Sequence, residues 1–248
     1  RGGVEAMKRV KLALSGLIKY LLGVVLVAAL LLLPAWTLAY PGAWLFMGVL
    51  FLPMLLMGVI MLFCAPDLLA KRLDSKEKQK TQQGVVKLAG LVFVGGFVLC
   101  ALDFRFGWSH VPTWLMIAAA VIFLIGYGMY AEVMRENAYL SRTIKVQEGQ
   151  TVVSTGLYGV VRHPMYLATL LMFLPMPLIL QSLWGLCVFG WYAVLIVIRI
   201  LNEEKVLTAE LDGYVDYKNK VKYRLKNYIF LLYLKGFIFG FSSSCCAK

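Results

Sequence analysis

The chain is poor in charged residues. Asp, Glu, Lys and Arg make up only 15% of its 248 residues, whereas about a quarter of the residues are charged in average soluble domains. Hydrophobic residues make up 61% of the chain. This composition excludes an ordinary water-soluble domain, because there are too few charged side chains to cover a surface that faces water.

Motifs that bind metals or form disulfide frameworks are also missing. The five cysteines occur singly or as the pair Cys245-Cys246, with no C-x-x-C spacing and no companion histidines. The sequence therefore predicts neither a zinc site nor a disulfide framework, and we expect no metal ligands. Cysteines beside apolar segments, such as Cys100, are expected simply to fill space.

Acidic residues are scarce relative to basic ones, which gives a net charge of +12. In a membrane protein such an excess is first a topology signal, because cytosolic loops collect Lys and Arg. We therefore expect the lipid bilayer as a partner and do not expect nucleic acid. The oligomeric state cannot be predicted from these features.

The apolar residues gather into six blocks with almost no charge inside them. A block of about 20 apolar residues is long enough for a helix to cross a hydrocarbon core of about 30 Å. No small-x-small cleavage site follows the first block, so we expect it to be a retained helix. The sequence predicts an all-α integral membrane protein with about six transmembrane helices, at about 17–33, 43–63, 84–102, 112–131, 164–180 and 183–201.

The segments between these blocks alternate between basic and nearly uncharged. Lys and Arg concentrate before the first block, between the second and third, between the fourth and fifth, and after the sixth, whereas Arg105 lies in a loop on the opposite side. This alternation predicts that both termini are cytosolic. We divide the chain into residues 1–135, with four helices and a solvated basic cytosolic loop at 65–83, then 136–227, and an apolar tail at 228–248 that is too short to span.

The fifth block is preceded by the sequence Arg162-His163-Pro164-Met165-Tyr166. Pro164 suits the first turn of a helix, where its missing N–H is not needed. Arg162 and His163 would then lie at the membrane surface beside the positive end of a helix dipole, a suitable place for a carboxylate or phosphate. The alternative is that Arg162 only follows the positive-inside pattern and Tyr166 belongs to an interfacial aromatic belt.

The sixth block ends in Arg199-Ile200-Leu201-Asn202-Glu203-Glu204. Arg199 and Glu203 are four residues apart and share one helix face. A guanidinium inside a membrane helix is costly, so it normally has a polar role or reaches the interface. The alternatives are that Arg199 snorkels to the surface and that Glu203 and Glu204 are ordinary solvated charges.

The two segments together carry the motifs G-x-Y-x-x-x-R-H-P-x-Y and R-x-x-x-E-E, followed by Gly-Tyr-x-x-Tyr. This combination, over about residues 137–224, resembles the isoprenylcysteine carboxyl methyltransferase family, and the related phospholipid N-methyltransferases share its plan. The resemblance implies a methyltransferase region at 136–227 with a cytosolic site for S-adenosylmethionine near the fifth and sixth helices.

The resemblance also implies roles for individual residues. Arg199 would face the carboxylate of the substrate, and Glu203 would meet the ammonium group of the cofactor. A strand-like stretch at 150–153 would lie beside the adenosyl part. The implied cofactor-binding residues are Gln150, Thr151, Val152, Val153, Tyr158, His163, Pro164, Met165, Tyr166 and Glu203.

Two positions depart from the family pattern. Gln150 stands where many relatives have a histidine. The segment Tyr223-Arg224-Leu225-Lys226 stands where relatives tend to have R-x-x-P.

The expected activity is S-adenosylmethionine-dependent O-methylation of an isoprenylcysteine-like or other lipophilic carboxylate. Phospholipid amine N-methylation is the alternative, and it would need a free carboxylate such as Glu204 as a base, because an amine must first lose a proton. A transporter or other non-enzymatic membrane protein is a remote third reading, since the spans carry few ionisable residues of the kind that line a substrate path.

Overall fold

The computed structural model describes residues 2–73, 80–137, 139 and 149–225. Every regular element in these ranges is a helix, and no strand occurs among them. The predicted all-α class is therefore confirmed. The expected strand-like stretch at 150–153 has no regular secondary structure, and the apolar tail expected at 228–248 lies outside the described residues.

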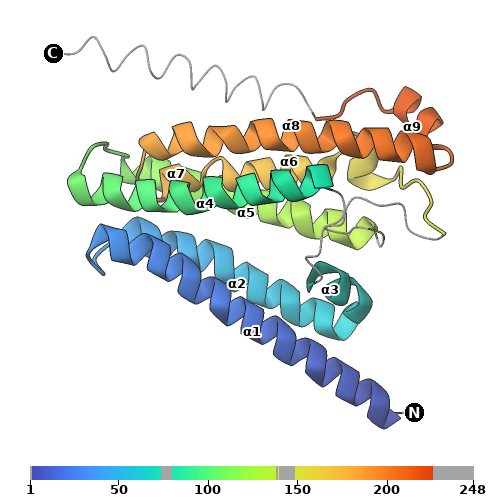
Figure 1. Cartoon of the computed structure of the whole chain (residues 1–248), viewed down its shortest axis with the longest axis horizontal. Helices are drawn as coiled ribbons and strands as arrows, with labels where there is room; N and C mark the ends of the chain where they lie inside the picture. Colours follow the sequence, from blue (N-terminus) through green and yellow to red (C-terminus); the bar gives the residue numbers. More distant parts are fainter. Residues whose placement is uncertain (1, 74–79, 138, 140–148, 226–248) are drawn as a thin grey trace.

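Among the described residues, five helices are long and apolar enough to cross a membrane. Large apolar side chains on their outer faces, such as Leu33, Leu52 and Leu91, are more than two-thirds exposed. In a bilayer these side chains would face lipid tails instead of water. The five helices are α1 (Gly2–Ala35), α2 (Pro41–Cys64), α4 (Lys80–Phe106), α5 (Thr113–Glu136) and α8 (Trp184–Glu210), and they run side by side along the molecule (Figure 1).

The apolar block expected at 164–180 differs from the others because it forms two short helices. These are α6 (Pro164–Phe173) and α7 (Met176–Ile179). The interruption coincides with Pro175 and Pro177, which lack the N–H that would continue the helical ladder. At 1.5 Å per residue, α6 spans about half of a hydrocarbon core.

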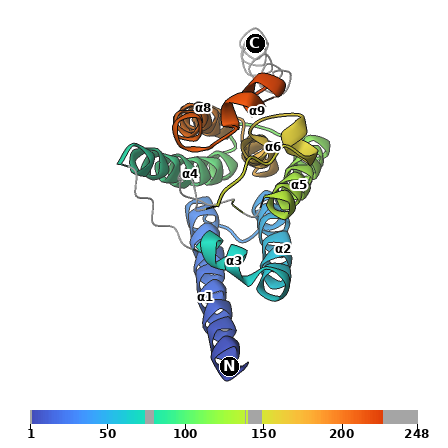
Figure 2. The same cartoon turned by 90° about the vertical axis from the view of Figure 1, so that its right-hand side faces the viewer.

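Helix α6 lies in the middle of the bundle, between α5 and α8 (Figure 2). The approach of α5 to α6 depends on Gly126, where an added Cβ would lie 3.0 Å from the carbonyl oxygen of Ala168 and 2.9 Å from Cγ of Met172. Helices α4 and α8 also pack against each other. Helix α6 itself contacts both α5 and α8.

A short helix, α3 (Pro66–Leu73), follows α2 at the end of the bundle where α1 begins. Its last carbonyl, that of Leu73, accepts a hydrogen bond from Lys19 Nζ at 2.7 Å. The prediction of a solvated basic segment is wrong for Arg72, which is 9% exposed. The reason is that α3 is amphipathic and turns Leu68 and Arg72, four residues apart, toward the bundle.

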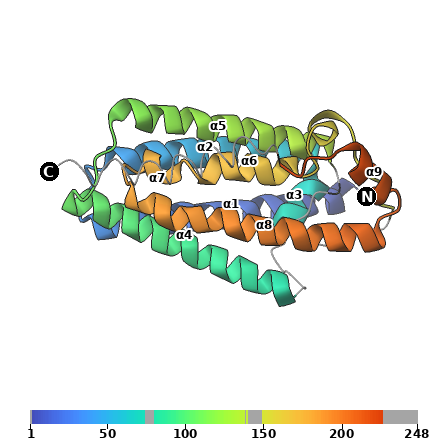
Figure 3. The same cartoon turned by 90° about the horizontal axis from the view of Figure 1, so that it is seen from above.

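The opposite end of the bundle is closed by a buried carboxylate. Asp103 accepts hydrogen bonds from the backbone N–H of Ser109 at 2.8 Å and from the hydroxyls of Ser109 at 2.6 Å and Ser182 at 2.5 Å. These contacts join the α4–α5 loop to the start of α8. The α4–α5 loop, which contains the exposed His110, lies at the opposite end of the bundle from α3 and α9 (Tyr214–Lys220) (Figure 3).

Candidate functional site

A pocket opens at the end of the bundle that carries α3 and α9. Its wall is formed by the end of α5, the segment before α6, the first turn of α6, the last part of α8 and α9. The structure brings together around this pocket all eleven residues predicted from the sequence: Gln150, Thr151, Val152, Val153, Tyr158, His163, Pro164, Met165, Tyr166, Arg199 and Glu203. Their roles in binding remain predictions.

The first turn of α6 supplies the floor of the pocket. His163 is the N-cap residue of α6 and Pro164 occupies its first turn, as the sequence predicted. Arg162 and His163 are 8% and 5% exposed. Both side chains are therefore enclosed by protein, which argues against the reading in which Arg162 is only a surface charge.

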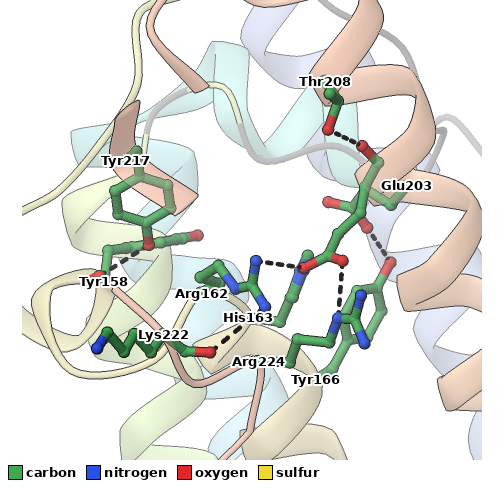
Figure 4. Close-up of polar contacts among 10 residues, drawn as sticks. Tyr158, Arg162, His163, Tyr166, Glu203, Thr208, Tyr217, Lys222 and Arg224 are labelled. Atoms are coloured by element: carbon green, nitrogen blue, oxygen red, sulfur yellow. Dashed lines mark hydrogen bonds and ion pairs between the residues drawn. The ribbon is translucent and has the colours of Figure 1, made fainter. Parts of the chain in front are cut away.

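Tyr166 links the two charged residues of α8 that face the pocket. Its hydroxyl accepts a hydrogen bond from Arg199 Nε at 3.0 Å. The same hydroxyl donates a hydrogen bond to the carboxylate of Glu203 (Figure 4). Tyr166 itself is 4% exposed. The guanidinium and the carboxylate are thus fixed on one side of the pocket. Because Arg199 is hydrogen-bonded to Tyr166 at the pocket, the alternative in which it only snorkels to the membrane surface is not favoured.

Glu204 is a buried acid that the sequence analysis considered only as the base for N-methylation. It is 4% exposed, and its carboxylate lies 3.2 Å from Arg162 Nη1, 3.3 Å from His163 Nε2 and 2.7 Å from Arg224 Nε. It is therefore not a solvated charge. Its three partners hold the carboxylate outside the pocket wall, so it is not free to act as a base.

The segment at 221–225 runs along the chain just before α6. The backbone N–H of Arg162 donates to the carbonyl of Tyr223 at 2.9 Å, and that of His163 donates to the carbonyl of Arg224 at 3.2 Å. Arg224 also reaches Glu204 from this segment. The residues that replace the R-x-x-P pattern of relatives therefore join α6 to α8.

A loop with tyrosines forms the outer wall. Asn137 Nδ2 donates to the Tyr158 hydroxyl at 2.9 Å, and the Tyr217 hydroxyl donates to the Tyr158 carbonyl at 2.7 Å. Burial raises the pKa of Tyr158 to about 12, so its hydroxyl keeps its proton at neutral pH. The 3-10 turn of this loop begins at Gly156, which has a φ of +50°. A Cβ added to Gly156 would overlap the Glu136 carboxylate.

Two polar atoms at the pocket are buried without a hydrogen-bond partner. They are Nε of Arg162 and the hydroxyl of Tyr214, and both residues line the pocket. Buried donors normally have partners, because an unpaired one costs about 1–3 kcal/mol. These two atoms are therefore suited to bind polar groups of a ligand.

A metal-binding group is not found in the described part of the chain, where no three His, Cys, Asp or Glu side chains lie together in a suitable arrangement. The pocket instead combines one acid, two guanidinium groups and several tyrosines with apolar walls from residues such as Val152 and Leu207. Such a site is suited to bind an organic ligand with both charged and apolar parts.

A comparison with known proteins finds similarity in the part of the chain that carries most of the pocket residues. A relative, the uncharacterized protein YpbQ of Bacillus subtilis (strain 168), is 33% identical over 96 residues, which are 38% of this chain and 57% of that protein. The match thus spans little more than half the length of the relative. Residues 114–211 match the phospholipid methyltransferase family, which confirms the expected resemblance for this segment.

Proposed function

We propose that this protein transfers the methyl group of S-adenosylmethionine to the carboxylate of an isoprenylcysteine-like or other lipophilic acceptor. The observation that carries the proposal is the arrangement of Arg199, Tyr166 and Glu203 on one wall of a pocket at the end of an apolar helix bundle. By the positive-inside pattern of the sequence, this end faces the cytosol.

The residues of the pocket fit the cofactor. Glu203 would hold the ammonium group, and the unpartnered donors of Arg162 and Tyr214 would bind its polar oxygens and nitrogens. The apolar side chains of Val152 and Val153 would pack against the adenosyl part. When bound, S-adenosylmethionine supplies a methyl group already activated on a positively charged sulfur, so the protein mainly positions the reactants and excludes water.

Arg199 would orient the acceptor. A carboxylate is ionised at neutral pH and needs no base to become a nucleophile. The side chain of Arg199 is held by Tyr166 and lies on the pocket wall, where a guanidinium can bind a carboxylate with two parallel hydrogen bonds. The apolar part of the acceptor would enter sideways from the bilayer.

Phospholipid N-methylation is the second candidate, and the name of the matching family favours it. This reaction requires a base that removes a proton from the amine. Glu204 does not suit this role because Arg162, His163 and Arg224 occupy its carboxylate. Glu203 would have to serve instead, although the proposal assigns it to the cofactor.

Calorimetry on the purified protein in detergent tests the cofactor. We expect S-adenosylmethionine to bind, and Glu203→Gln to weaken binding by about tenfold, which corresponds to about 1.4 kcal/mol. Glu210→Gln is the matched control, because Glu210 is an exposed acid at the end of the same helix. A folded wild-type protein that does not bind the cofactor would contradict the proposal.

Methyl transfer to lipid extracts separates the two candidates. Label from S-[methyl-³H]adenosylmethionine should enter a lipid product from which mild alkali releases the label as volatile methanol, as it does from a methyl ester. Label that stays non-volatile after alkali would instead support N-methylation, since hydroxide cleaves the acyl esters of a phospholipid but does not release an N-methyl group.

A further inference from the structure

A second hollow lies on the face of α8 that points away from the pocket. It is a groove of about 510 Å³ between the end of α8, the neighbouring helix α9 and the segment at 221–225 (Figure 2). Lys205 lines this groove, whereas Glu203 lines the pocket. Residues two apart on a helix point about 160° away from each other. The groove is therefore separate from the space assigned to the cofactor and the acceptor.

Three cationic side chains from three different segments line the groove, which we call the basic groove. They are Lys205 of α8, Lys218 of α9 and Arg224. Among the described residues that line it, Glu204 is the one acid, and its carboxylate is buried and also lies 3.2 Å from Arg162 Nη1. The basic groove thus carries an excess of positive charge.

Arg224 can bind a second partner in addition to Glu204. Its Nε donates to the Glu204 carboxylate at 2.7 Å, while its side chain is 47% exposed. A guanidinium has five N–H donors in a planar fork, and this fork matches the oxygens of a phosphate. The terminal nitrogens of Arg224 can therefore bind a phosphate in the groove while Nε stays on Glu204.

The face of α8 that leads to the groove is apolar and exposed. Val194, Ile198 and Leu201 follow one another at intervals of three or four residues, so they form a row on one side of the helix, the apolar row. Lys205 continues this row one turn later, and Leu201 and Lys205 both line the groove. In a bilayer the row would face acyl chains, and the groove would lie where the apolar part of the helix ends.

We propose that the basic groove binds the phosphate headgroup of an anionic membrane phospholipid whose acyl chain lies along the apolar row. This lipid is a partner additional to the methyl acceptor, which is assigned to Arg199 on the other face of α8. Phosphatidylcholine has the same phosphate but also a quaternary ammonium, which the three cations of the groove repel. The groove therefore favours a lipid with a net negative charge.

Such a lipid would hold together two segments that border the pocket. Arg224 belongs to the segment at 221–225, whose carbonyls accept the backbone N–H groups of Arg162 and His163 just before α6. A headgroup bound to both Arg224 and Lys205 would tie this segment to α8. The inference does not rest on the proposed function, because lipid binding is measured without methyl transfer.

Native mass spectrometry of the full-length protein in a neutral detergent tests the inference. The protein is mixed with equal amounts of phosphatidylglycerol and phosphatidylcholine that carry the same acyl chains. We expect the wild type to retain about fivefold more phosphatidylglycerol, since each Lys or Arg near an anionic headgroup favours binding. A tenfold excess of sn-glycerol 3-phosphate should leave this ratio within about twofold, because it has the phosphate but no chain to lie along the apolar row.

The double variant Lys205→Gln/Lys218→Gln should retain the two lipids about equally. Lys220→Gln/Lys222→Gln is the matched control, because it removes the same charge from exposed lysines that do not line the groove. The control should keep the preference of the wild type. Should the double variant not fold, the single variants are used, and we expect each to lower the preference by about twofold.

Three results would overturn the inference. The first is a wild type that retains both lipids equally, and the second is a preference that survives in the groove variants or is lost equally in the control. The third is displacement of phosphatidylglycerol by glycerol phosphate, which would make the groove a site for soluble phosphates. Calorimetry with S-adenosylmethionine is separate: a lipid preference without cofactor binding contradicts the proposed function but not the lipid site.

Discussion

The hydroxyl of Tyr166 joins Arg199 to Glu203, because it accepts a hydrogen bond from the guanidinium at 3.0 Å and donates one to the carboxylate. The two charged residues are one turn apart on α8, and the tyrosine comes from α6. One neutral side chain thus fixes the direction of both charges at the pocket. Four predictions follow from this contact and its neighbours.

Tyr166→Phe removes the hydroxyl but keeps the ring. We expect methyl transfer to fall by about tenfold to a hundredfold, since hydrogen bonds to charged groups contribute about 1.5–3 kcal/mol. Tyr192→Phe is the control: Tyr192 packs in the same cluster as Tyr166 but does not line the pocket. Equal losses of activity in the two variants would show that Tyr166 acts only through packing.

Glu204→Gln removes the charge that pairs with Arg162 and Arg224. We expect a loss of about 3 kcal/mol in the free energy of unfolding, because breaking a buried ion pair leaves an uncompensated charge. Denaturant unfolding in detergent measures the change, with Glu210→Gln as the exposed comparison. A variant as stable as wild type would mean that the cluster contributes little to the fold.

Arg224→Met tests the contact between the segment at 221–225 and α8. We expect a loss of only about 1 kcal/mol in stability, because the Arg224 side chain is 47% exposed and solvent screens its charge. Methyl transfer should fall by more than stability suggests, since Glu204, which contacts both Arg162 and His163, loses one of its three partners. Lys222→Met, an exposed neighbour, should match wild type in both assays.

Gly156→Ala places a methyl group against the carboxylate of Glu136 at a residue whose φ is +50°. We expect the free energy of unfolding to fall by more than about 1 kcal/mol, because backbone strain and overlap act together. Gly149→Ala separates the two causes, since Gly149 has a φ of +69° but open space around it. If the free energy of unfolding falls equally in both variants, overlap with the Glu136 carboxylate is not a cause of the loss in Gly156→Ala.

The sequence specified the pocket residues better than it specified the helix that carries them. The motif around Arg162 and Tyr166 predicted the start of α6 and its place beside α8. It did not predict that the block ends after ten residues, because hydropathy averages over Pro175 and Pro177 and treats 164–180 as one span. The two prolines inside the apolar run were the sequence feature that could have predicted the break between α6 and α7.

The burial of Glu204 and its contact with Arg224 were missed for a different reason. Adjacent acids on a helix point about 100° apart, so the pair Glu203-Glu204 had to face two different neighbours. The sequence does not say which neighbour each one meets. Arg224, twenty residues later, carries no pattern that would pair it with Glu204.

The sequence by itself determined the helical class and five of the apolar spans, because periodicity and hydropathy are properties of neighbouring residues. The family resemblance of its motifs indicated eleven of the residues that line the pocket. Only the tertiary structure decided that Glu204 is buried among Arg162, His163 and Arg224 and that Arg72 reaches Met165 from α3. Such contacts join segments that are 20 to 93 residues apart, and packing of whole helices brings them together.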